Sequence, residues 1–315
     1  MIRQTILLSA IAAAFWAAPA AANVDFPPAV PAPIVEGESL SPPEPAQQPA
    51  EPEQAIEKTQ DKQPETEPQN IPVEISSSEE PGKIEEPVES LALPPLPQGE
   101  NGPVVVELFS SQACVFCPKA DAFLGELAQQ PALIALDCHV SYFDVKVGAL
   151  SLPFCSSRQS LYEGTLRAGP KYTPQMVING RYDAIGYRKE AVLRALEKAS
   201  QDRLQRLKIE KEPSSGLFDL SFPALEGEEP AKELKIWLLV FDLPHNIKVA
   251  EGGNSGKNII YTNIVSNAGF LGTWDGNQKS LRFDAKLQDN SAGFAVLAQD
   301  ETTGKIYATG QYKVP

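Results

Sequence analysis

The apolar positions of the chain form two patterns, and the change between them falls near Leu207. Between residues 103 and 206, short β-branched runs alternate with stretches whose apolar residues recur at helical spacing. This predicts the order β-α-β-α-β-β-α, with Asn179-Gly180 as a hairpin turn. The predicted strands are Val104–Phe109, Ala132–Val140, Gln175–Asn179 and Arg181–Ile185, and the predicted helices are Pro118–Gln129, Ser156–Leu166 and Arg188–Gln205.

From residue 207 to residue 315, short apolar runs are separated by turns rich in Gly, Asp and Asn. This spacing is typical of antiparallel sheets, so we expect a sandwich-like β domain. Its predicted strands are Leu217–Phe222, Leu234–Phe241, Asn258–Val265, Gly293–Gln299 and Lys305–Thr309. The predicted fold class is therefore an α/β domain over 103–206 followed by an antiparallel β-rich domain over 207–315.

Residues 1–22 have the pattern of a secretory signal peptide. Arg3 precedes the apolar run Thr5–Ala18, which is shorter than the roughly 20 residues of a membrane-spanning helix. Ala20-Ala21-Ala22 supplies the small residues that a signal peptidase accepts, which places cleavage near Ala22. An uncleaved anchor is the alternative. We therefore expect a periplasmic or secreted protein without stable membrane insertion.

Residues 23–102 have a different composition and predict a disordered, acidic, Pro-rich linker. Positions 23–100 hold 17 of the 29 Pro in the 315-residue chain, 17 Asp and Glu, and three Lys. Their net charge is 3 − 17 = −14, which equals the formal charge of the whole protein. A segment this polar buries too little apolar surface to offset the entropy of ordering it. It serves either as a passive spacer or as an arm that sets the reach of the folded part.

The remainder of the chain is almost neutral, with 23 basic and 24 acidic residues over 101–315. It lacks the excess positive charge that binding to nucleic acid or to an anionic membrane requires. The Gly-rich stretch Gly252–Gly256 lacks the Gly-Lys-Ser/Thr ending of a phosphate-binding loop. The sequence therefore implies no nucleic-acid partner and no organic cofactor.

The clearest chemical signal is Cys114-Val115-Phe116-Cys117, which lies between a predicted strand and a predicted helix. Unpaired N–H groups and the positive dipole end at a helix N-terminus stabilise a thiolate. Because the thiolate is the form that attacks a disulfide, we predict that Cys114 is the nucleophile and Cys117 the resolving thiol.

Cys138 and Cys155 are the other two cysteines, and in an exported chain four cysteines most often form disulfides. A disulfide bond between them would close a loop and stabilise the folded state by about 3 kcal/mol in the chain-entropy model. We predict that this bond is structural. Two alternatives stay open: a second redox pair that passes electrons to the first, and a zinc site made of all four thiolates.

The tetrapeptide Tyr172-Thr173-Pro174-Gln175 is the second signal. Pro174 precedes a predicted strand, where its missing N–H is tolerated. In the thioredoxin-like fold a cis-Pro occupies this position beside the cysteine pair, and Thr173 and Pro174 would line the substrate groove. With the order of elements, this pattern predicts a thioredoxin-like domain over 103–206.

Several stretches closely resemble a bacterial family of exported proteins catalogued as domain of unknown function 1223. They are Val106–Asp121, His139–Asp144, Arg158-Gln159, Tyr172–Gly180, Asn254–Gly256 and Leu271–Gly276. The resemblance covers about residues 103–315 and implies a thioredoxin-like fold and export rather than a particular chemistry. Arg158 and Gln159 either shape a substrate groove or anchor the second predicted helix.

These observations lead first to an exported thiol–disulfide oxidoreductase that acts on protein thiols or disulfides of the periplasm. Thioredoxin-like proteins can use a buried acid to move the proton of the second cysteine, but neither Glu107 nor Asp121 is clearly at that site from sequence. This favours an alternative, a non-catalytic binding or assembly module of the cell envelope with structural disulfides. A third hypothesis is a Cu(I)-handling protein with Cys114, Cys117 and His139 as ligands; His139 otherwise ends a strand with ordinary hydrogen bonds.

Overall fold

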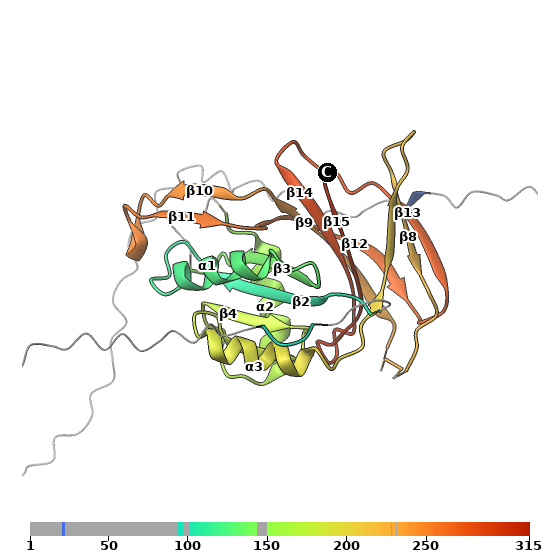
Figure 1. Ribbon diagram of the computed structural model, residues 1–315, viewed down its shortest axis with the longest axis horizontal. Coiled ribbons are helices and arrows are strands. Elements are labelled where there is room, and N and C mark those ends of the chain that lie inside the picture. Colours follow the sequence, from blue (N-terminus) through green and yellow to red (C-terminus); the bar gives the residue numbers. More distant parts are fainter. Residues whose placement is uncertain (1–20, 23–92, 97–100, 144–149, 228, 231) are drawn as a thin grey trace, which may run out of the picture. The chain divides into compact units, whose positions relative to one another are not determined.

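The computed structural model describes residues 21–22, 93–96, 101–143, 150–227, 229–230 and 232–315 (Figure 1). The signal peptide expected over 1–22 and the linker expected over 23–102 lie almost entirely outside these residues. Within the two segments, the short strand β1 (Ala21–Ala22) pairs in parallel with β13 (Lys279–Phe283). Leu93 and Leu96 pack against a hydrophobic core. All described residues belong to one compact unit.

The first part of the fold is a four-stranded mixed sheet in the order β3-β2-β4-β5. β2 and β3 are parallel, whereas β4 is antiparallel to both β2 and β5. The strands are β2 (Val104–Ser110), β3 (Leu133–His139), β4 (Gln175–Ile178) and β5 (Tyr182–Ile185), and the helices are α1 (Cys117–Leu127), α2 (Pro153–Leu166) and α3 (Lys189–Ala199). This is the element order that the periodicity predicts.

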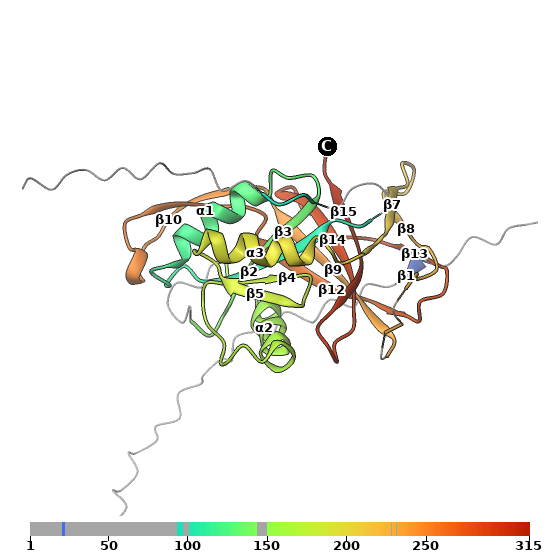
Figure 2. The same ribbon diagram turned by 60° about the horizontal axis from the view of Figure 1, so that its bottom comes forward.

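Alternating side chains of β2 enter two different cores, as expected for a strand buried on both faces. Val104, Val106 and Leu108 pack with α1 and α3 on one face. Val105 and Phe109 pack on the other face with α2 (Figure 2). Among the described residues, none of the helices combines the length and apolar character needed to cross a bilayer.

The second part of the fold contains two larger sheets and a hairpin. One sheet has the order β12-β9-β14-β15-β6, the other β1-β13-β8-β7, and β10 pairs with β11. The remaining strands are β6 (Gln205–Arg206), β7 (Lys208–Lys211), β8 (Phe218–Phe222), β9 (Leu234–Asp242), β10 (His245–Lys248), β11 (Asn258–Tyr261), β12 (Val265–Trp274), β14 (Ser291–Gln299) and β15 (Ile306–Lys313). A short 3₁₀ turn, Gly252–Asn254, connects β10 to β11.

The five-stranded sheet is buried on both faces. On one face, Leu238 of β9 packs with Phe218 and other residues of the sheet that contains β8 and β13, which gives a sandwich. On the other face, Leu239 of β9 shares a core with Val105 of β2 and Tyr162 of α2. Residues on both sides of position 206 therefore contribute to one continuous hydrophobic core.

Two predicted elements differ from the observed ones. The single strand predicted over Asn258–Val265 is interrupted at Asn263, whose φ of 54° lies in the left-handed region, and β12 begins afterwards. The helix predicted over Arg188–Gln205 ends at Ala199. Asp202 follows it and accepts hydrogen bonds from Asn179 and Arg181, so the chain turns back toward the β4–β5 hairpin.

Candidate functional site

Cys114 and Cys117 lie in the turn between the end of β2 and the start of α1, where the sequence analysis expects them. Both are free thiols and both are buried. The Cys114 N–H donates to the carbonyl of Ser111, and the Cys117 N–H donates to the carbonyl of Cys114. This tight turn brings the Cys114 thiol to the N-terminus of α1, which begins at Cys117.

The two thiols have opposite electrostatic environments. Hydrogen bonds from the Cys117 thiol, the Thr173 side chain and the backbone N–H groups of Phe116 and Cys117 lower the pKa of Cys114 to about 6, although burial opposes this. Burial, and next the hydrogen bond and charge of Cys114, raise the pKa of Cys117 above its ordinary value. Cys114 is therefore ionised at neutral pH while Cys117 keeps its proton, the division of roles that thiol exchange requires.

Thr173 and Pro174 lie beside this pair, on the segment that leads into β4. The Thr173–Pro174 peptide bond is cis. The Thr173 side chain is hydrogen-bonded to the Cys114 thiol, as described above, and the Pro174 carbonyl accepts a hydrogen bond from the Gly186 N–H at 2.9 Å. The segment is thus held in place by the chain that follows β5 and is in contact with Cys114.

Behind Cys117, the structure has the buried acid that the sequence alone did not locate. Ser110, the last residue of β2, is hydrogen-bonded to the Cys117 thiol, and its hydroxyl donates to Asp121 Oδ1 at 2.7 Å. Burial, with a further contribution from Asp137, raises the pKa of Asp121 well above its ordinary value. An acid is therefore connected to Cys117 through one hydroxyl group.

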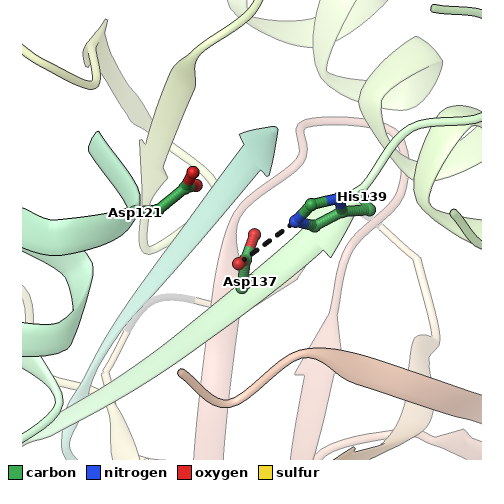
Figure 3. A group of neighbouring side chains, drawn as sticks. All are labelled: Asp121, Asp137 and His139. Carbon is green, nitrogen blue, oxygen red and sulfur yellow. Dashed lines mark ion pairs between the residues drawn. The ribbon is translucent and has the colours of Figure 1, made fainter. Parts of the chain in front are cut away.

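Asp121 belongs to a cluster with Asp137 and His139, which we call the buried triad (Figure 3). Asp121 comes from α1, and Asp137 and His139 are two residues apart on β3, so both face the same side of the sheet. One potential ligand atom from each lies within 4.8 Å of the other two. Neither cysteine is in this group, so among the described residues the donors nearest His139 are carboxylates rather than the thiols of the Cu(I) hypothesis.

Cys138 and Cys155 form a disulfide that joins the end of β3 to the first turn of α2. Both half-cystines are buried in the core that also contains Phe109 and Tyr162. Because this bond occupies both sulfur atoms, the structure gives no support to a zinc site made of all four thiolates.

Asn254, in the 3₁₀ turn between β10 and β11, is fully buried against the cysteine loop. Its Nδ2 donates to the carbonyl of Cys114 at 2.7 Å and to the carbonyl of Gln112 at 3.1 Å. Its neighbour Gly253 lies so close to Val115 that a Cβ there would be 2.4 Å from Val115 Cγ2. A turn 140 residues away in sequence thus fixes the backbone that carries Cys114.

Comparison with known proteins gives a family for this chain. Residues 105–299 match the family described as "Protein of unknown function (DUF1223)". The chain belongs to that family. This DUF1223 chain is also 28% identical over 93 residues to a protein named "Probable Thioredoxin" from Archaeoglobus fulgidus, an alignment that covers 30% of this chain and 85% of that protein.

Two solved structures resemble this DUF1223 protein. A crystal structure of an Agrobacterium tumefaciens protein superposes with a TM-score of 0.57 at 24% identity, over 69% of this chain and 96% of the other. This likeness shows a shared fold. HBP35 of Porphyromonas gingivalis gives a TM-score of 0.45 at 13% identity, over 69% of this chain and 77% of that one.

Arg158 of the DUF1223 chain is an internal anchor. It is buried and contacts Glu107 through two nitrogens, and it also donates to Gln299 and Tyr162. It therefore ties α2 to β2 and to β14 instead of facing a substrate. Gln159 is hydrogen-bonded to the Tyr172 carbonyl at 2.8 Å and so supports the segment before the cis-Pro.

Sequence reasoning missed the roles of Asn254 and Asp137. Asn254 had a partial signal, since Asn254–Gly256 is one of the stretches that resemble the family. Asp137 had none, because a single Asp within a predicted buried strand does not reveal which side chains lie opposite it.

Proposed function

We propose that this protein is a thioredoxin-like thiol–disulfide oxidoreductase that acts on protein thiols or disulfides through Cys114 and Cys117. The observation that carries the proposal is the asymmetry of the two thiols: the pKa of Cys114 is lowered to about 6, and that of Cys117 is raised. The sheet order β3-β2-β4-β5, the cis bond before Pro174 and the similarity to the "Probable Thioredoxin" protein support the thioredoxin-like assignment.

In the reducing direction, the Cys114 thiolate attacks one sulfur of a substrate disulfide. A Cys114–substrate disulfide forms, the substrate S–S bond breaks, and the released thiolate takes a proton. The Cys117 thiol then loses its proton and attacks Cys114 Sγ, which releases the second substrate thiol. Two protein thiols become one disulfide while one substrate disulfide becomes two thiols, so no organic cofactor is needed.

The surface around the pair suits an apolar polypeptide segment as substrate. Val115 and Phe116 are 56% and 58% exposed, although they lie between two buried cysteines. Tyr142 is also exposed and lies near enough for the charges of both cysteines to add to the effect of burial, which raises the pKa of Tyr142 to about 12. We infer that Thr173 and Pro174 line the groove between these side chains, with Asn254 holding the loop from behind.

We further propose that the protein works in the periplasm or as a secreted protein after cleavage near Ala22. The disulfide between Cys138 and Cys155 is consistent with an oxidising compartment. The partners of the protein would be other exported proteins with thiols or disulfides, and not nucleic acid. Cell fractionation, with mass spectrometry of the mature N-terminus, tests this placement; a cytoplasmic protein with an intact N-terminus contradicts it.

The test of the chemistry is to trap the mixed disulfide. Reduced Cys117→Ala protein incubated with insulin should accumulate a dithiothreitol-sensitive adduct on Cys114, because the resolving thiol is absent. Cys114→Ala should form none, and Ala113→Ser, a change in the same turn that keeps both thiols, should turn over insulin like the parent protein.

The reduction potential of the pair provides the second readout. A value above about −270 mV, in the range of exchange enzymes, supports the proposal. A value below about −300 mV, together with equal adduct formation by Cys114→Ala and Cys117→Ala, would show that a Cys114–Cys117 disulfide is structural. It would favour the alternative, a non-catalytic binding or assembly module of the cell envelope.

A further inference from the structure

The buried triad has more negative charge than its hydrogen bonds compensate. Asp121, Asp137 and His139 are 2%, 0% and 0% exposed. Neither oxygen of Asp137 accepts a hydrogen bond from the residues that the structure describes, and Asp121 Oδ2 accepts none either. A buried carboxylate without donors is costly by several kcal/mol unless a cation lies next to it.

The same atoms converge on one point. Asp137 Oδ2 is 3.3 Å from His139 Nε2, and the Asp121 carboxylate approaches both from α1 (Figure 3). Two carboxylates and one imidazole are a donor set that divalent first-row metals such as Zn²⁺ accept. With a neutral imidazole, the charge of one divalent ion cancels the charge of the two carboxylates.

We propose that Asp121, Asp137 and His139 form a binding site for one divalent transition-metal ion of the zinc class. Bonds of about 2.0–2.2 Å in tetrahedral geometry require ligand atoms about 3.4 Å apart. The Asp137–His139 pair already has this separation, and the Asp121 ligand atom lies within 4.8 Å of both, so a side-chain movement of Asp121 completes the set. The proposal does not depend on the thiol chemistry, because neither cysteine is a ligand.

The surroundings provide support for the ligands and a path for the ion. The Ser110 hydroxyl orients Asp121 from outside the triad, and the Tyr261 ring packs edge-on against His139 with 5.0 Å between centroids. Orienting contacts of this kind are typical of metal sites. A groove of about 570 Å³ between α1 and β11 is lined by Asp121 and Thr262, so it leads to the edge of the triad.

The test is a Zn²⁺ titration of the full chain carrying Cys114→Ser and Cys117→Ser, so that no free thiol competes for the ion. Calorimetry should give one Zn²⁺ per chain, and Zn²⁺ at 100 times its dissociation constant should raise Tm by about 5–10 °C. Adding Asp137→Asn should weaken binding at least about ten-fold and remove the rise in Tm. Asp219→Asn, the same change at an acid paired with Arg282 outside the triad, should leave both unchanged.

Without metal, Asp137→Asn should melt no lower than its parent, because Asn keeps the shape of the side chain and the Asp137 oxygens accept no hydrogen bond from the described residues, their one contact being His139 at 3.3 Å. A second probe needs no variant of the triad: Co²⁺ should produce a visible absorption band that saturates at one ion per chain and disappears when Zn²⁺ is added. Absence of this band, or equal zinc affinity in the Asp137→Asn and Asp219→Asn proteins, overturns the proposal.

Discussion

The replacement Asn254→Ala is the most informative perturbation of this fold, because one side chain connects the β10–β11 turn to the cysteine loop. The change deletes hydrogen bonds to the carbonyls of Cys114 and Gln112, and both residues are buried. A carbonyl that loses its donor in a buried site costs about 1–3 kcal/mol, and the Cys114 carbonyl costs less than the Gln112 carbonyl because it still accepts from the Cys117 N–H. The third contact, from Lys257 to Asn254 Oδ1, is at the surface and adds little. We therefore expect the free energy of unfolding to fall by about 2–4 kcal/mol.

The assay is urea unfolding of the reduced protein, followed by the fluorescence of Trp237 and Trp274. The midpoint should decrease while the slope with denaturant stays constant, because the surface exposed on unfolding is almost unchanged. Lys257→Ala is the matched control, since it keeps the Asn254 amide and should cost less than about 1 kcal/mol.

The same replacement should change the reactivity of Cys114. Without its anchored carbonyl, the turn no longer holds the thiolate against the N–H groups of Phe116 and Cys117, and the pKa of Cys114 should rise from about 6 toward its ordinary value. Iodoacetamide labelling as a function of pH measures this shift. If Asn254→Ala loses less than about 0.5 kcal/mol and keeps the labelling midpoint of the parent, the reasoning about this contact is wrong.

Three further predictions concern other parts of the structure. In the reduced parent, labelling of Cys114 should increase with pH through a midpoint near 6. Because the pKa of Cys114 is lower in the folded than in the unfolded protein, its thiolate stabilises the fold above the unfolded pKa, and this stabilisation is lost as the pH falls through about 6. Cys114→Ala should remove this pH dependence of the free energy of unfolding. Arg158→Met should lower the free energy of unfolding by about 3–5 kcal/mol by leaving Glu107 buried and unpaired, and adding Glu107→Gln should recover much of the loss. Replacing Cys138 and Cys155 with Ala should cost about 2–4 kcal/mol, and dithiothreitol should then no longer lower Tm.

The pattern of apolar residues predicts much of the fold because the central strands of the first sheet are buried along their whole length. β2 and β3 are apolar on both faces, and helical spacing marks α1 and α3. The sequence does not predict the interruption of the strand over Asn258–Val265, because the composition of this stretch is strand-like throughout. The break is visible only in the backbone at Asn263. The end of α3 depends on hydrogen bonds from Asn179 and Arg181 to Asp202, which local propensity does not contain.

The sequence locates the two free thiols through their spacing, but not the groups that set their pKa values. The C-x-x-C motif and the Thr-Pro motif are each contiguous, so each predicts a feature of its own. The groups behind the thiols come from several elements: Ser110 ends β2, Asp121 lies in α1, and Asp137 lies in β3. Their proximity results from the parallel pairing of β2 with β3 and from the packing of α1 on the sheet. Neither arrangement can be recognised from the type of the individual residues.

The contact between Asn254 and the cysteine loop gives a physical reason why the α/β part and the β-rich part occur in one chain. An isolated C-x-x-C turn has its own hydrogen bonds, yet here the carbonyls of Gln112 and Cys114 are satisfied by a residue of the β-rich part. Leu239 of β9 and Val105 of β2 share a core as well, so the two parts are joined both at the cysteine loop and through the sheet behind it. A protein cut at position 206 would lose six of the sixteen buried residues of that core together with the Asn254 amide. Its cysteine turn would therefore lose the amide that anchors the Gln112 and Cys114 carbonyls, and we expect the pKa of Cys114 to lie nearer its ordinary value in the fragment.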